Sequence, residues 1–122
     1  MNLNGWMAAG LVFLPALAWA GEADVVNVEA VQRPGGTYDF HVAVRHGDAG
    51  WDHYADKWQV IGPDGKMLGE RILLHPHVNE QPFTRSLTGV TIPDGIDSVT
   101  LRAGDSVHEF GGEEMTVKLP GR

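Results

Sequence analysis

The segment "TYDFHVAVRH", residues 37–46, decides the fold of this chain. Its apolar side chains recur at every second position, at Tyr38, Phe40, Val42 and Val44, and most positions between them are polar. Successive side chains of a β-strand point to opposite faces, so this alternation places one apolar face against a core and leaves the other face more polar. The segment therefore predicts a half-buried β-strand.

Comparable short segments lie on both sides of this strand, separated by turn sequences rich in Gly, Pro and Asp. Upstream, Val26, Val28 and Ala30 alternate with polar residues before the turn "RPGG". The expected strands downstream lie within residues 57–61, 66–74, 82–92, 97–104 and 113–120. Seven short strands with turn signals about every ten residues are typical of an antiparallel β-sandwich.

The strand order, the aromatic-rich second strand, Trp58 in the third strand and the run "IPDGIDSVTLRAGDSVHEFGGEEMTVKL" together resemble a fibronectin type III or immunoglobulin-like domain of a small secreted bacterial protein. The resemblance implies an all-β, seven-stranded antiparallel sandwich. Two hallmarks of the immunoglobulin group are missing, namely the cysteine pair between the sheets and a tyrosine at the corner. A sandwich of this kind hosts many unrelated activities, so the resemblance implies no function.

Residues 1–20 have the pattern of a cleaved signal peptide. Residues 6–17 form an apolar stretch too short to cross a bilayer, and Ala18-Trp19-Ala20 fits the small-x-small rule for cleavage. We expect cleavage after Ala20 and one sandwich domain over residues 21–122, located in the periplasm or secreted. The alternative is that the apolar stretch stays as an N-terminal membrane anchor.

Composition narrows the classes of function. The sequence has no cysteine, which excludes a disulfide framework and thiolate metal sites. Its formal net charge of −7 and its lack of Lys/Arg clusters disfavour nucleic acid and, after signal cleavage, a membrane as partners. No G-x-S-x-G nucleophile motif and no phosphate-binding glycine loop is present. We therefore expect a binding protein rather than an enzyme.

The loops fall into two chemically different sets. If successive strands run up and down, the turns at 33–36, 62–65 and 88–95 share one end of the sandwich, and the loops at 46–56, 75–81 and 104–112 share the other. The first set contains ordinary turn residues, whereas every histidine except His41 lies in the second. Long loops rich in His and acidic residues are more often functional than turns chosen for geometry alone.

Imidazole and carboxylate are the ligands that zinc or copper(II) takes where no thiolate is available. His75 and His77 lie two residues apart, so in an extended segment both side chains point to one side and can share an ion. Neighbouring loops supply the other candidates for a metal site: His53, His108, Asp52, Glu80 and Asp105. The mature N-terminus should emerge at the same end, where its amine is a further possible ligand.

Three other readings of these residues stay open. In the first, the loops and the aromatic side chains of Trp51, Tyr54 and Phe110 bind a protein or glycan partner. In the second, Arg85 is a buried partner of Asp52 or Asp105, which makes the polar residues a structural network. In the third, the histidines form a pH-sensitive interface. Of the remaining residues, we expect His46 to be exposed at a strand end, His41 to lie on the surface and Trp58 to lie in the core.

Overall fold

The segment that decides the fold forms strand β2 (Thr37–Arg45) of the computed structural model, which describes residues 21–122. Its four alternating apolar residues, Tyr38, Phe40, Val42 and Val44, are all fully buried. The predicted half-buried strand is therefore confirmed, and its apolar face forms part of the core.

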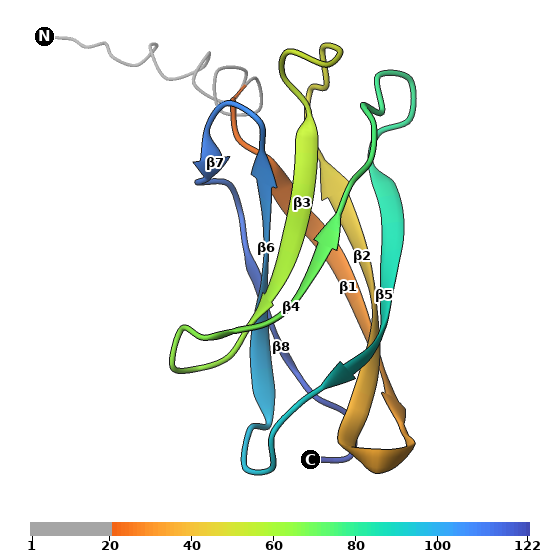
Figure 1. Cartoon of the computed structure of the whole chain (residues 1–122), viewed down its shortest axis with the longest axis vertical. Helices are drawn as coiled ribbons and strands as arrows, with labels where there is room; N and C mark the ends of the chain where they lie inside the picture. Colours follow the sequence, from red (N-terminus) through yellow and green to blue (C-terminus); the bar gives the residue numbers. More distant parts are fainter. Residues whose placement is uncertain (1–20) are drawn as a thin grey trace, which may run out of the picture.

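Two antiparallel sheets face each other (Figure 1). One sheet has the order β1-β2-β5, and the other has the order β4-β3-β6-β7, with β8 also paired to β6. A single 3₁₀ turn, Pro34–Gly36, links β1 to β2. The remaining strands have these bounds: β1 Asp24–Arg33, β3 Ala55–Ile61, β4 Met67–Ile72, β5 Phe83–Thr91, β6 Ser98–Asp105, β7 Glu109–Phe110 and β8 Met115–Lys118.

The all-β class and the antiparallel two-sheet arrangement are confirmed, but residues 21–122 form eight strands where seven were expected. The additional strand is β7, a pair of residues that joins the edge of β6 next to Gly104 and Asp105. Two residues are too short to show alternation, so the sequence contained no signal for this strand.

Strand β1 differs from the prediction in the phase of its first residues. Val25 is buried at its start, and Val28 and Ala30 pack against the core farther along, so the inward positions are not evenly spaced. The pairing with β2 shifts between Val25 and Asn27. This shift inserts one extra residue, as a β-bulge does, and moves Val26 out of the inward set.

The core lies between the sheets and is built from aromatic and branched side chains. Trp58 is fully buried as expected, together with Phe40, Phe83 and Leu101. Removing a large apolar side chain from water contributes about 1.5–3 kcal/mol. The sequence contains no cysteine, so no disulfide adds to the contribution of this core. None of the helices found in residues 21–122 is long and apolar enough to cross a membrane.

The up-and-down path of the chain places the loops as predicted. The turns at 34–36 and 92–97 lie at the end of the sandwich nearer the C-terminus, and the turn at 62–66 projects sideways in the same half of the molecule (Figure 1). At the opposite end, which we call the histidine end, residues 21–23 lie at the same end of the sandwich as the loops 46–54, 73–82 and 106–108. All the histidines except His41 belong to the histidine end.

Candidate metal centre

Two core-facing strands place polar residues at the histidine end. In β2 the inward series of Phe40, Val42 and Val44 continues, two residues later, at His46. In β6 the inward series of Leu101 and Ala103 continues at Asp105. His46 is 1 % exposed and Asp105 is 0 % exposed. The strands therefore bury an imidazole and a carboxylate where the apolar core ends.

These two residues form a group with His53, from the loop 46–54, that has the composition and spacing to hold a metal ion. Each residue offers one ligand atom, and these atoms all lie within 4.8 Å of one another. Nε2 of His46 is 3.4 Å from Oδ2 of Asp105, and Nε2 of His53 is 3.5 Å from Oδ1. Within residues 21–122 this is the one such group of three or more His, Asp or Glu residues.

The carboxyl group of Asp105 is ionised in spite of its burial. Burial alone raises the pKa of its carboxyl, but the backbone N–H groups of His108 and Val107 donate to Oδ1 at 2.6 and 2.8 Å. The imidazole of His108 and the charge of His46 add to this effect, so the pKa of Asp105 is lowered overall. The carboxylate is therefore negative at neutral pH although it is shielded from solvent.

His46 is oriented by a second buried carboxylate, that of Asp48. Nδ1 of His46 lies 2.5 Å from Oδ1 of Asp48, and Nε2 lies 3.1 Å from the carbonyl oxygen of Gly21. Burial alone lowers the pKa of His46, but the hydrogen bond and charge of Asp48, the Gly21 carbonyl and the charge of Asp105 outweigh it, and the pKa is raised. In the metal-free protein His46 therefore donates from both nitrogens, one toward Asp48 and one toward Gly21.

His53 and His108 complete the surroundings of Asp105. Nε2 of His53 is buried and has no hydrogen-bond partner among residues 21–122. Nδ1 of His108 is 3.2 Å from each oxygen of Asp105. The His53 ring lies between the other two, with centroids 4.7 Å from His46 and 4.9 Å from His108. Since the His108 side chain is 36 % exposed, it lies at the solvent side of the cluster.

The predicted pair His75 and His77 lies close together but apart from this group. Their ring centroids are 4.6 Å apart, and the His77 ring stacks on Phe83 at 3.9 Å. Nε2 of His77 accepts a hydrogen bond of 2.8 Å from Arg85. Burial and the charge of Arg85 lower the pKa of His77. His77 is therefore packed and bonded to a cation, and the exposed His75 has no third ligand beside it in the described part of the chain.

Some of the other predicted metal ligands lie in the group and some lie outside it. Of the sequence-based candidates, His53, His108 and Asp105 come together, whereas Asp52 and Glu80 are exposed on their loops. Arg85 does not pair with Asp52 or Asp105 as proposed from the sequence. It contacts His77 and lies 3.8 Å from Glu80.

His46 was expected to be exposed, and this expectation was wrong. The signal that identifies it was present, because His46 continues the inward alternation of β2 beyond the last apolar residue. Asp48 has no such signal. It lies in a loop, where side-chain direction does not follow a period.

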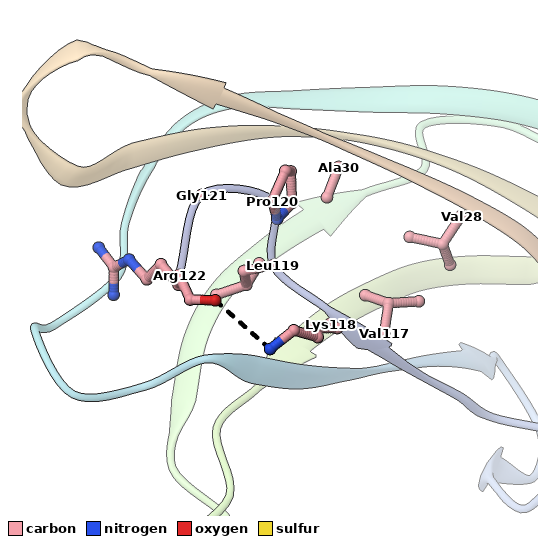
Figure 2. A pocket seen from close by; sticks show the side chains of 8 residues that line it. All are labelled: Val28, Ala30, Val117, Lys118, Leu119, Pro120, Gly121 and Arg122. Atoms are coloured by element: carbon pink, nitrogen blue, oxygen red, sulfur yellow. Dashed lines mark hydrogen bonds between the residues drawn. The ribbon is translucent and has the colours of Figure 1, made fainter.

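A groove between β1 and β8 shares no lining residue with this cluster (Figure 2). Aliphatic side chains and the last residues of the chain line it, and its one marked hydrogen bond joins Nζ of Lys118 to the carbonyl of Arg122. None of the eight residues labelled in Figure 2 is a His, Asp or Glu. The groove therefore offers no ligand set of the kind found at the histidine end.

Comparison with known proteins yields a relative described as "Putative lipoprotein" from Halomicrobium mukohataei. It is 44% identical over 96 residues, which are 79% of this chain and 47% of the relative. The chain thus spans about half the length of the curated relative that it matches. No protein-family model matches the chain. No solved structure matches it either.

Proposed function

We propose that this chain is an exported, non-catalytic metal-binding protein that holds one zinc or copper(II) ion at the histidine end. His46, His53 and Asp105 are the proposed ligands, and His108 lies at the solvent side of the ion. The observation that carries the proposal is the convergence of two imidazole nitrogens and a buried carboxylate within 4.8 Å. Nitrogen and oxygen ligands of this kind suit both metals.

The spacing of the ligand atoms supports a four-coordinate ion. Bonds of about 2.0–2.1 Å place the corners of a tetrahedral zinc site about 3.3 Å apart. The two contacts between imidazole nitrogens and Asp105 measure 3.4 Å, to Oδ2, and 3.5 Å, to Oδ1. With one ligand atom from each residue the atoms lie within 4.8 Å of one another, so the side chains would have to move closer together to surround one ion.

Asp48 supports the same proposal from outside the ligand set. Metal-bound histidines commonly donate their second ring N–H to a carboxylate, which fixes the tautomer and the ring orientation. Nδ1 of His46 has such a partner in Asp48, so its Nε2 is left to face Asp105. A cation can take the place of the proton on Nε2 without disturbing the contact with Asp48.

Two observations support an exported protein. The sequence of residues 1–20, which lie outside the described residues, predicts a signal peptide. The relative's description as a lipoprotein agrees with a place in the cell envelope or outside the cell. The strand order of its sheets is also compatible with the proposed fibronectin type III or immunoglobulin-like kinship.

The test is isothermal titration of the processed, chelator-treated protein with Zn²⁺ and, separately, with Cu²⁺. We expect one ion per chain at micromolar or lower concentration. The His53→Ala variant should bind more than about 100-fold more weakly, a loss larger than that from an outer partner. His75→Ala is the matched control, because it removes a histidine of the same end that has no place in the group, and it should bind as the original protein does.

Two results would overturn the proposal. The first is an absence of binding of either metal to the original protein. The second is loss of binding in His75→Ala with full binding in His53→Ala, which would place the ion at the His75–His77 pair instead.

A second function, docking of a protein partner, is favoured by a separate observation. Four of the large apolar side chains that are exposed in residues 21–122 lie in the loops of the histidine end: Trp51 at 67 %, Leu74 at 75 %, Val78 at 56 % and Val107 at 57 %. Acidic residues lie in the same loops, including Asp52 and Glu80. Aliphatic side chains beside acidic groups suit a protein with an apolar patch and a basic rim better than they suit a glycan.

This second function is tested by capture from the exported proteins of the source organism. A specific partner should be retained by the original protein and lost with Leu74→Ser/Val78→Ser. Met67→Ser/Ile72→Ser is the matched control, because these residues are also large, apolar and exposed, at 51 % each, but lie on β4. Equal capture by both variants would remove the docking proposal.

A further inference from the structure

The first described residue, Gly21, lies against the candidate metal centre. Its carbonyl oxygen is 3.1 Å from Nε2 of His46. A Cβ atom at Gly21 would lie 3.8 Å from Cε1 and 3.9 Å from Nε2 of His108. Gly21 therefore contacts one proposed ligand, and a Cβ at this position would be in van der Waals contact with His108, on the solvent side of the cluster.

The position of Gly21 is fixed by the residues that follow it. Ala23 is fully buried in the core. Val25 donates its backbone N–H to the carbonyl of Glu113 at 2.8 Å, and Asp24 accepts from the N–H of Glu113 at 2.8 Å. These contacts join the start of β1 to the segment before β8. A chain that begins at Gly21 therefore keeps its first residue at the cluster.

The predicted cleavage gives this residue a new chemical group. Hydrolysis of the peptide bond between Ala20 and Gly21 consumes one water, leaves a carboxylate on Ala20 and frees an α-amine on Gly21. An α-amino group has a pKa of about 7.7–8.0, well below that of a lysine, so its neutral form is accessible near neutral pH. The amine nitrogen and the carbonyl oxygen of one glycine can also chelate a single ion.

We propose that removal of the signal peptide completes the metal centre, because the free α-amine of Gly21 becomes a ligand beside His46, His53 and Asp105. This inference rests on the proposed function and names its regulation: the precursor lacks the ligand and the processed protein has it. The resulting set of three nitrogens and one oxygen favours copper(II), which binds such donors more tightly than zinc does. Metal uptake is then confined to protein that has been exported and processed.

The experiment compares two forms of the same chain that both begin at Gly21, one with a free amine and one with an N-acetyl cap. Mass spectrometry first establishes the amino-terminal residue of the exported protein as Gly21. Titration with Cu²⁺ should then show binding to the capped form that is weaker by about 10–100-fold or more. His75→Ala with a free amine is the matched control. It changes a histidine of the same end that lies outside the group of His46, His53 and Asp105, so it should bind as the original protein does.

A spectroscopic readout separates ligation from crowding by the acetyl group. Protein labelled with ¹⁵N only at glycine should show altered nitrogen couplings in the paramagnetic resonance spectrum of bound Cu²⁺, because a glycine nitrogen is bound to the ion. Unchanged couplings, or equal affinity of the capped and free forms, would overturn the inference. If affinity in that case still depends on His53, the proposed function stands without it. An absence of Cu²⁺ binding to every form would remove the inference, and an absence of Zn²⁺ binding as well would remove the proposed function.

Discussion

Two buried aspartates at the histidine end, Asp48 and Asp105, have the same burial and the same neighbour but different surroundings. Both side chains are 0 % exposed, and both lie next to His46. Asp48 accepts from the backbone N–H groups of Ala55 and His77 at 3.0 and 2.6 Å, and from His46 at 2.5 Å. Asp105 has imidazoles of His46, His53 and His108 at 3.2–3.5 Å.

The difference separates a structural group from a site. Around Asp48 every contact is short and joins two loops to the end of β2, so the carboxylate acts as a fixed junction. Around Asp105 the imidazole contacts are longer, and Nε2 of His53 has no partner among residues 21–122. Both aspartates accept from two backbone N–H groups, but at Asp105 both groups donate to Oδ1, which leaves Oδ2 facing imidazoles alone. At Asp48 each oxygen accepts from a backbone N–H group, so a cation there would have to displace one. Burial alone therefore does not distinguish a metal site from a structural group, but the distribution of the donors over the two oxygens does.

The largest expected effect is that of Asp48→Ala on stability. The change leaves the His46 imidazole and two backbone N–H groups buried without their acceptor, so the free energy of unfolding should fall by about 3–5 kcal/mol. Urea denaturation measures this loss. Asp48→Asn, which keeps one acceptor oxygen, should lose less and remain folded. A loss below about 1 kcal/mol for Asp48→Ala would contradict the role of Asp48 as a junction.

Asp105→Asn should have its main effect on metal binding. The amide oxygen can still accept from the N–H groups of Val107 and His108, so the free energy of unfolding should fall by only about 1–2 kcal/mol. Loss of the negative ligand should weaken Zn²⁺ or Cu²⁺ binding by more than about 100-fold. Titration of Asp105→Asn beside Asp48→Asn checks this result. A greater loss of affinity in Asp48→Asn would reverse the assignment of site and junction.

His77→Ala should lower stability and leave metal binding unchanged. The change removes a ring that stacks on Phe83 and accepts from Arg85, which should cost about 1–2 kcal/mol. His77 lies outside the group of His46, His53 and Asp105, so the affinity for metal should change less than about twofold. Thermal unfolding and metal titration of the same sample test both statements. Loss of metal binding in a folded His77→Ala variant would contradict this prediction and would indicate that His77 is a metal ligand.

The smallest expected effect is on the pH dependence of the metal-free protein. The raised pKa of His46 contributes stability that is full below its unfolded pKa near 6.5 and is lost as pH rises through the folded value. The lowered pKa of Asp48 contributes stability that is present above its unfolded pKa near 3.9 and is lost as pH falls through the folded value. Asp48→Asn should therefore flatten the profile at both ends. An NMR titration should show the pKa of His46 falling in this variant, and an unchanged His46 pKa would contradict the coupling.

Much of the fold was predictable because strands carry a period. The alternation in β2 assigned Tyr38, Phe40, Val42 and Val44 to the core, and the structure buries all four. The same period, continued one step further, assigns His46 and Asp105 to the end of the core. The up-and-down order of the strands was enough to place the histidine loops at one end.

By itself, then, the sequence determined the sandwich and the end at which its imidazoles and carboxylates gather, since both follow from periodicity and connection order. Only the tertiary structure decided which of them meet. Loops have no fixed period, so the direction of each loop side chain depends on its contacts. The imidazole ring of His77 stacks on Phe83, and its Nε2 accepts a hydrogen bond from Arg85, so these contacts set its direction. The path of the loop 46–54 turns His53 toward Asp105, a residue from a strand far away in the chain.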